Sequence, residues 1–175
     1  MNKEIKLFLT DIDGVWTDGG MYYDNKGNEF KKFNTSDSAG VLFCKLLGIE
    51  VGIITGENSL AVKKRAEKLQ IKNCFLGIKD KVAAAERLLL ELGIDWSEVA
   101  YVGDDINDIE LLEKVGLSAS PISAPEYIKD KVDWVIQVKG GDGVFRHFVE
   151  KYLKEKKLLD DVLNKYFKEK KKFRQ

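Results

Sequence analysis

Short apolar segments alternate with amphipathic ones along most of the chain. Apolar runs bounded by turn residues predict buried β-strands at residues 5–10, 51–55, 74–76, 99–102, 117–119 and 134–138. Between them, apolar positions at helical spacing predict helices at residues 39–47, 59–69, 81–92, 108–115, 124–128 and 143–154. This alternation is typical of an α/β protein whose parallel sheet is covered by helices on both faces.

A hairpin interrupts the alternation directly after the first strand. Residues 21–23 and 29–33 have strand character, and residues 24–27 between them read Asp-Asn-Lys-Gly, a turn of the Asn and Gly type. Ligands of an open parallel sheet bind beyond the carboxyl ends of its strands. We therefore expect the hairpin to overhang the ligand site as a flap. No other segment is long enough to form a cap domain.

The end of the chain is basic and amphipathic. Residues 151–175 carry ten Lys or Arg and four acidic residues, which leaves 19 basic and 25 acidic residues in the first 150. Apolar side chains near helical spacing among these lysines predict a helix. We predict one α/β domain over residues 1–155 and a basic helical tail over residues 156–175 that packs on its own domain or on a neighbour.

Composition narrows the class of partner. The 175 residues contain 29 basic and 29 acidic side chains, so no global field attracts nucleic acid or an anionic membrane. The apolar run near the N-terminus is too short for a signal peptide or a membrane span. Cys44 and Cys74 show neither CxxC spacing nor a nearby His cluster, which argues against a disulfide framework and a zinc site. We expect a cytoplasmic protein with no nucleic-acid or membrane partner.

Two acids end the first strand, in the segment Asp11-Ile-Asp13-Gly14. Residues two apart on an extended chain project to the same side, so both carboxylates are expected to reach one crevice. One can attack phosphorus, and the other can protonate the leaving alkoxide and later activate water. Ordinary turns also carry this pattern. A calcium loop does not fit, because such a loop needs an oxygen ligand at its fifth position and an acid at its twelfth, where this chain has Val15 and Tyr22.

A second acid cluster, Gly-Asp104-Asp105-Ile-Asn-Asp108, follows the strand at 99–102. The two clusters are predicted to converge, and a carboxylate beside a phosphate dianion requires a hard cation. Asp11, the carbonyl of Asp13 and Asp104 suit magnesium. By itself, the second cluster also fits a plain helix start in which Asp108 caps the helix or orients a lysine.

Between the clusters lie Thr55-Gly56, after the strand at 51–55, and Lys81, at a helix start. A hydroxyl and an ammonium can hold and neutralise phosphoryl oxygens, which is most of what phosphoryl transfer requires. Alone, each residue is more typical of a strand-end cap or a solvated lysine. The order of all four segments favours a phosphoryl-transfer site.

That order, DxDG, Thr-Gly, Lys and GDDxxD, resembles the four motifs of the haloacid dehalogenase (HAD) phosphatases across residues 5–150. The resemblance implies a Rossmann-like sandwich and an aspartyl-phosphate intermediate that depends on magnesium. It implies roles for six residues: Asp11 as nucleophile, Asp13 as general acid and base, Thr55 and Lys81 as phosphate ligands, Asp104 as metal ligand, and Asp108 in support of Lys81.

Longer segments resemble the capless branch of HAD enzymes that dephosphorylates eight- and nine-carbon 3-deoxy-ulosonates. They are DIDGVWTDG from Asp11, FNTSDSAG from residue 33, YVGDD from residue 101 and GGDGVFR from residue 140. The resemblance implies a homotetramer in which a neighbouring subunit closes the site. It also places Asp37 and Ser38 in the site lining. Arg146 could reach a substrate carboxylate in a neighbour, although an exposed arginine at a helix start fits slightly better.

Residue 57 separates two substrates within this branch. Phosphatases of 3-deoxy-D-manno-octulosonate (KDO) 8-phosphate usually carry Thr-Gly-Arg where this chain has Thr-Gly-Glu57. Glu57 could accept hydrogen bonds from the longer polyol or N-acyl amide of a nine-carbon substrate. We therefore expect the 9-phosphate of deaminated neuraminate (KDN) or of N-acetylneuraminate, with KDO 8-phosphate as the alternative. Lys68 is a candidate to assist, although a solvated lysine fits it better.

Two other classes of function fit the sequence less well. A phosphoaccepting receiver domain has an acidic pair after its first strand and a lone acceptor after its third, whereas this chain has DxD first and GDDxxD late. A catalytically idle assembly module would not need the complete set of acids, threonine and lysine. The unclaimed His147 is expected to have a structural role.

Overall fold

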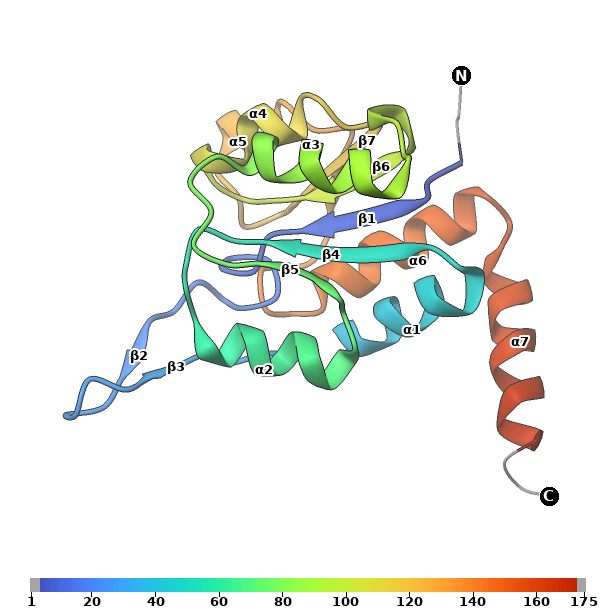
Figure 1. The fold of residues 1–175 in the computed structure, drawn as a ribbon, viewed down its shortest axis with the longest axis horizontal. Helices are drawn as coiled ribbons and strands as arrows, with labels where there is room; N and C mark the ends of the chain where they lie inside the picture. The colour runs from blue at the N-terminus through green and yellow to red at the C-terminus, as the bar shows by residue number, and fades with distance from the viewer. Residues whose placement is uncertain (1–3, 173–175) are drawn as a thin grey trace.

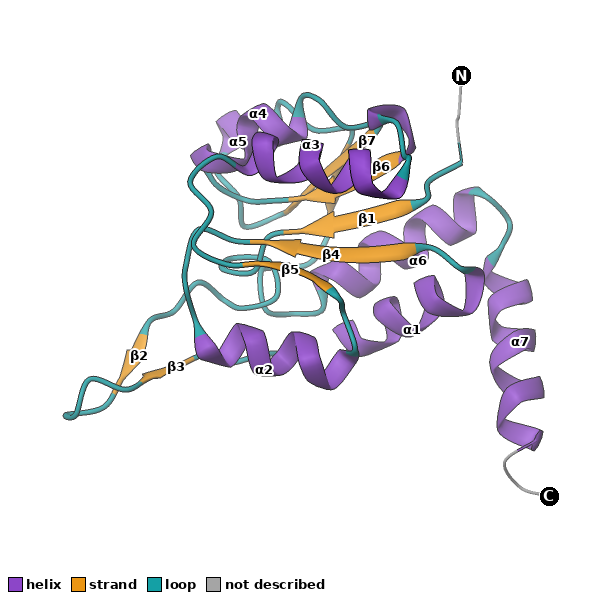
Figure 2. Cartoon of the chain, in the orientation of Figure 1, coloured by secondary structure: helices purple, strands orange, loops and turns teal. Residues whose placement is uncertain are grey.

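A computed structural model describes residues 4–172 and contains one six-stranded parallel sheet in the order β5-β4-β1-β6-β7-β8 (Figures 1 and 2). The strands are β1 (Leu7–Thr10), β4 (Glu50–Ile54), β5 (Asn73–Phe75), β6 (Val99–Val102), β7 (Leu117–Pro121) and β8 (Trp134–Ile136). Each one pairs in parallel with its neighbours. The structure therefore confirms the predicted α/β fold with a central parallel sheet.

Helices cover both faces of the sheet. One layer contains α1 (Asp37–Leu47), α2 (Leu60–Leu69) and α6 (Val144–Glu155), and the other contains α3 (Lys81–Leu92), α4 (Ile109–Leu112) and α5 (Glu126–Lys129) (Figure 1). Two short 3₁₀ turns, η1 (Trp96–Glu98) and η2 (Ile106–Asp108), flank β6. A separate cluster of buried apolar side chains lies between each helical layer and the sheet.

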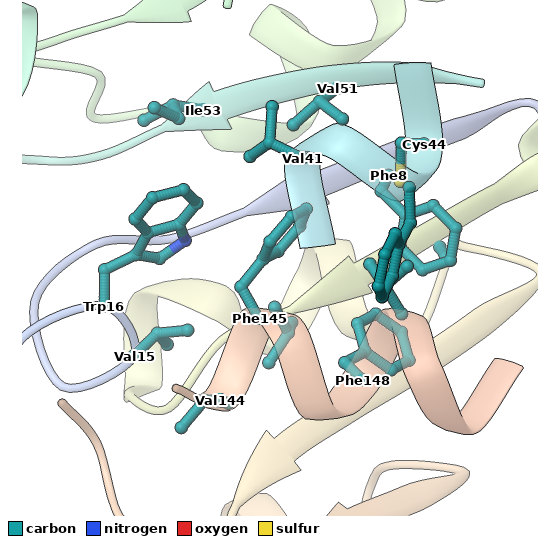
Figure 3. Close-up of a cluster of buried hydrophobic side chains, with 14 of the residues drawn as sticks. Phe8, Val15, Trp16, Val41, Cys44, Val51, Ile53, Val144, Phe145 and Phe148 are labelled. Carbon is teal, nitrogen blue, oxygen red and sulfur yellow. The ribbon is translucent and has the colours of Figure 1, made fainter. Parts of the chain in front are cut away.

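Strand β1 lies at the centre of both clusters. Phe8 points into the first, where its ring centroid lies 5.3 Å from that of Phe148 and 6.3 Å from that of Phe145 (Figure 3). Leu7 and Leu9 point into the second, and all three β1 side chains are fully buried. The strand that leads to Asp11 is thus held on both faces, which explains its continuous apolar run.

The flap is an antiparallel hairpin of β2 (Tyr22–Tyr23) and β3 (Glu29–Phe30) that projects from the body near the start of α2 (Figure 1). Asp24 organises its turn, because its Oδ1 accepts backbone hydrogen bonds from Lys26 and Asn28, each at 2.8 Å. Both strands are shorter than predicted. Within residues 4–172, the chain forms no cap domain over the sheet.

Some element boundaries differ from the predicted ones. The helix expected at 108–115 is shortened to α4, which directly follows η2, and the chain then turns at Gly116 to enter β7. A Cβ at Gly116 would lie 2.3 Å from the carbonyl oxygen of Ser97, so the turn is packed tightly against η1. Strand β8 ends at Ile136, where a turn joins the Val138 N–H to the Ile136 carbonyl at 2.8 Å.

The tail forms helix α7 (Leu159–Lys172), which contacts both α1 and α6. Val162 is fully buried in the cluster shared with these helices, whereas Phe167, farther along, is 56% exposed. The division into a domain and a tail at residue 155 remains a prediction. No helix among residues 4–172 has the length and apolar character that a membrane span requires.

The burial of Val162 predicts that the first half of α7 contributes to stability. Val162→Ala should lower the free energy of unfolding by about 2 kcal/mol, because two buried methyl groups and their packing contacts are lost. Phe167→Ala is the matched control in the exposed half and should cost less than about 0.5 kcal/mol. Urea unfolding measures both, and equal losses would contradict the packing of α7.

Candidate active site

The residues predicted to carry the chemistry meet where the strand order reverses. Strand β1 lies between β4 and β6, and the chain moves to opposite sides of β1 in its first and second halves. Asp11, Thr55 and Asp104 follow the carboxyl ends of these three neighbouring strands. Such a reversal leaves a crevice that binds ligands in open α/β sheets.

The crevice is a cleft of about 360 Å³ that combines both acid clusters. Its lining residues are Asp11, Asp13, Gly14, Gly19, Thr55, Gly56, Glu57, Asp104, Asp105 and Asn107. A larger hollow of about 500 Å³ lies at the opposite edge of the sheet, beside the start of β4, and none of the predicted site residues line it. The chemistry therefore belongs to the smaller cleft.

Lys81 is held between two carboxylates at the first residue of α3. Its Nζ lies 3.1 Å from Asp11 Oδ1 and donates a hydrogen bond to Asp108 Oδ1 at 2.6 Å. The Tyr101 hydroxyl donates to the same Asp108 oxygen. Asp108 Oδ2 accepts the backbone N–H of Asp104 at 2.9 Å and that of the next residue at 3.1 Å. Asp108 thus orients both Lys81 and the loop that carries Asp104.

Asp13 is held through one of its two carboxylate oxygens. Its Oδ1 accepts hydrogen bonds from Lys31 Nζ at 2.7 Å and from the Thr17 hydroxyl at 3.3 Å. Its Oδ2 is buried and has no hydrogen-bond partner among residues 4–172. The loop itself is anchored by Trp16, whose indole N–H donates to the Thr10 hydroxyl at 3.0 Å.

The loop after β1 and the loop after β6 approach each other so closely at Gly14 that this position requires glycine. Its φ of +81° lies in the left-handed region, and a Cβ there would lie 1.9 Å from Asp104 Oδ2. Any larger residue would strain the backbone and displace the Asp104 carboxylate.

Thr55 and Glu57 follow β4, on the other side of β1 from Asp104. Thr55 is buried directly after β4, and its hydroxyl oxygen accepts the Glu57 N–H at 3.4 Å. Glu57 is exposed and its side chain lines the cleft. The cleft therefore has a threonine hydroxyl and the exposed carboxylate of Glu57 among its lining groups.

Negative charge is crowded in the cleft. Burial and repulsion from Asp108 raise the pKa of Asp11 to about 7, although the attraction of Lys81 acts to lower it. Burial and repulsion from Asp11 and Asp108 raise the pKa of Asp104 to about 8. Burial opposes the charge on Lys81, but its pairs with Asp11 and Asp108 outweigh that effect and raise its pKa.

The same crowding suits a hard divalent cation. Asp11, Asp104 and Asp108 each offer one carboxylate oxygen, and these oxygens lie within 4.8 Å of one another. Both oxygens of Asp108 already accept hydrogen bonds, whereas Asp104 Oδ1 is buried without a partner among the described residues. Asp11 and Asp104 are therefore the side chains that fit magnesium, and the predicted Asp13 carbonyl follows Asp11 in the same loop.

Asp37 and Arg146 meet outside the cleft. Asp37 is fully buried at the start of α1, and its Oδ1 accepts the backbone N–H of Arg146 at 3.2 Å. Burial raises the pKa of Asp37 to about 6, although the hydrogen bonds that its carboxylate accepts from backbone N–H groups act to lower it. Arg146 Nε donates to Glu150 at 2.7 Å. Within one chain, Asp37 therefore caps α6 and does not line the cleft.

Ser38 and Lys68 also lie outside the cleft of their own chain. The Ser38 hydroxyl donates to the Thr35 carbonyl at 2.6 Å. Lys68 is in the last turn of α2, whereas the start of α2 is the end near the site. A part for either residue in the site, which the resemblance implied for Ser38 and the sequence suggested for Lys68, remains a prediction.

Three residues of the site were not identified from the sequence. Lys31 reaches Asp13 from the flap, Tyr101 supports Asp108, and Asn107 lines the cleft. Tyr101 carried a usable signal, because a hydroxyl in a buried strand needs a partner. Lys31 carried none, since its contact depends on how the hairpin folds back.

Comparisons with known proteins agree with this geometry. A family model described as haloacid dehalogenase-like hydrolase matches residues 76–148. The chain is 37% identical over 160 residues to the KDO 8-phosphate phosphatase of Escherichia coli strain K12, covering 91% of this chain and 85% of that protein. It is 35% identical over 151 residues to the Haemophilus influenzae enzyme of the same name, covering 86% and 84%.

Solved structures extend the similarity to the fold. The Moraxella catarrhalis KDO 8-phosphate phosphatase, in complex with magnesium ion, phosphate ion and KDO, aligns with a TM-score of 0.88 and 34% identity over 93% of each chain. The cobalt-bound Haemophilus influenzae phosphatase aligns with a TM-score of 0.83 and 35% identity, covering 86% of this chain and 88% of that one. Sequence and fold together show that this chain belongs to the haloacid dehalogenase-like hydrolases, in the family of the KDO 8-phosphate phosphatases.

Proposed function

We propose that this phosphoric monoester hydrolase releases phosphate from KDO 8-phosphate through an aspartyl-phosphate on Asp11. The observation that carries the mechanism is the meeting of Asp11, Asp13, Thr55 and Lys81 around one cleft at the carboxyl edge of the sheet. The substrate is supported by the relatives, whose names state KDO 8-phosphate and one of which holds KDO and phosphate.

The first step transfers the phosphoryl group to the protein. An Asp11 oxygen forms a bond to phosphorus while the ester P–O bond breaks, and Asp13 gives its proton to the leaving alkoxide. The Lys81 ammonium, 3.1 Å from Asp11, is placed to neutralise the phosphoryl oxygens, and the Thr55 hydroxyl can donate to them.

The second step releases phosphate. Asp13, now a carboxylate, accepts a proton from water as the water oxygen bonds to phosphorus and the Asp11–phosphorus bond breaks. Asp11, Asp104 and the Asp13 carbonyl would hold magnesium, which would supply positive charge and lower the repulsion between the Asp11 carboxylate and the phosphate dianion. Asp108 acts through Lys81, which it orients at 2.6 Å.

One observation favours a second candidate substrate. Glu57 lines the cleft directly after Thr55-Gly56, at the position where the resemblance to KDO 8-phosphate phosphatases implies an arginine. A carboxylate at this rim accepts hydrogen bonds from a polyol or an amide, which suits the 9-phosphate of KDN or N-acetylneuraminate. The nine-carbon substrate is therefore retained as the alternative.

A homotetramer is part of the proposal. The flap exposes the large apolar side chains of Met21, Tyr22, Tyr23 and Phe30, and the cleft has no cap among residues 4–172. Association through the flap would bury these side chains and bring a neighbour toward the cleft, where Arg146 could reach a substrate carboxylate. The cytoplasmic location and the absence of nucleic-acid and membrane partners remain predictions.

Phosphate release from a panel of substrates tests the proposed function. With magnesium, KDO 8-phosphate should be hydrolysed with at least about tenfold higher kcat/KM than hexose phosphates, because the cleft must discriminate by its polyol contacts. KDN 9-phosphate and N-acetylneuraminate 9-phosphate complete the panel. A preference for either nine-carbon ester would replace the first candidate by the second, and no release from any ester would support the idle-module alternative.

Magnesium affinity should rise with pH. Without metal, Asp11 and Asp104 hold protons up to about pH 7 and pH 8, so the metal must displace protons below these values. Both folded pKa values exceed the value of about 3.9 for an unfolded Asp, so the metal-free fold loses stability as pH rises toward 8.

Isothermal titration calorimetry should therefore give a magnesium Kd about tenfold or more lower at pH 8 than at pH 6. Comparing two buffers of different ionisation heat measures the protons released. An unchanged Kd with no proton release would contradict the crowded-acid description of the cleft.

A further inference from the structure

We infer that Lys31 of the flap positions Asp13 for proton transfer, by holding Oδ1 so that Oδ2 is the oxygen that carries the proton. The inference rests on the proposed function, because it assigns Lys31 a part in the steps for which Asp13 is the acid and the base. Lys31 directly follows β3 of the hairpin that projects from the body (Figure 1), and its Nζ reaches Asp13.

The contact of Lys31 is unlike that of a solvated flap lysine. Its side chain is 1% exposed, and its Nζ lies 2.7 Å from Asp13 Oδ1 and 3.2 Å from Glu29 Oε1. The next residue, Lys32, has a side chain that is 74% exposed and lies 3.5 Å from Asp18. Two adjacent lysines therefore have different environments, and one of them reaches the catalytic acid.

These contacts give the two oxygens of the Asp13 carboxylate different environments. Both donors, Lys31 and the Thr17 hydroxyl, bind Oδ1. Oδ2 is buried and has no partner among residues 4–172. A proton on Oδ1 would face an ammonium 2.7 Å away, so the contacts reserve Oδ2 for the proton.

A short chain of contacts ties this arrangement to the rest of the domain. Glu29 Oε1, which pairs with Lys31, also accepts the Ser59 hydroxyl at 3.2 Å, directly before α2. Lys31 therefore links the position of the flap to the orientation of Asp13.

The leaving group decides how much this positioning matters. A sugar alkoxide needs the proton of Asp13 as the ester bond breaks, whereas p-nitrophenolate leaves without one. The ratio kcat/KM reports steps up to phosphoryl transfer to Asp11, so it contains the acid step and excludes the later water attack. Loss of Lys31 should thus separate the two kinds of ester.

The test compares Lys31→Met with the matched control Lys32→Met, both assayed with magnesium. For KDO 8-phosphate, or the nine-carbon ester if that is preferred, Lys31→Met should lower kcat/KM about 10- to 100-fold. For p-nitrophenyl phosphate it should lower kcat/KM less than about threefold. Lys32→Met should leave both values close to wild type.

A second variant guards against a folding defect. Glu29→Gln keeps Lys31 but removes the negative charge of one of its two carboxylate partners, and it should give a smaller loss with the same selectivity for the sugar phosphate. Equal losses for both esters in Lys31→Met and Glu29→Gln, or no loss for either, would overturn the role of Lys31. Failure of the wild-type protein to hydrolyse any ester would instead overturn the proposed function, and this inference with it.

Discussion

The crowding of acidic side chains around one lysine is the constraint on which the cleft depends. Asp11, Asp104 and Asp108 place oxygens within 4.8 Å of one another, and the Lys81 ammonium contacts two of them. One ammonium does not neutralise three carboxylates, and the raised pKa values of Asp11 and Asp104 express the remaining repulsion. A divalent cation removes that repulsion, so the arrangement that disfavours the empty cleft is the one that favours magnesium and a phosphate ester.

The rest of the fold keeps these charges in place. Strand β1 is buried on both faces, by Phe8 against α6 and by Leu7 and Leu9 against the opposite layer, so Asp11 has little freedom to move away. The loop after it is held by the Trp16 hydrogen bond to Thr10 and must carry glycine at position 14. Apolar packing thus maintains a polar site that is electrostatically unfavourable without its ligands.

The sequence was informative where chemistry coincides with the ends of regular elements. Thr55 and Asp104 could be placed because parallel strands end at one edge of a sheet, and Lys81 because its helix starts there. Lys31 and Asp37 could not, because their partners depend on how the flap folds back and how α1 meets α6. The sequence also did not show where the helix predicted at 108–115 would end, because the turn that follows it at Gly116 packs against Ser97.

The family relationship identifies the chain as a phosphatase. Because of Glu57, an assay must decide whether the substrate is an eight-carbon or a nine-carbon sugar acid. The covalent role of Asp11 is the claim on which both candidate substrates depend. Acid quenching during turnover, followed by mass spectrometry of the peptides, tests it most directly. The mechanism predicts a phosphoryl group on the peptide that contains Asp11, dependent on magnesium and absent from Asp11→Asn. Continued phosphate release by Asp11→Asn, or a phosphoryl group on another carboxylate, would contradict it.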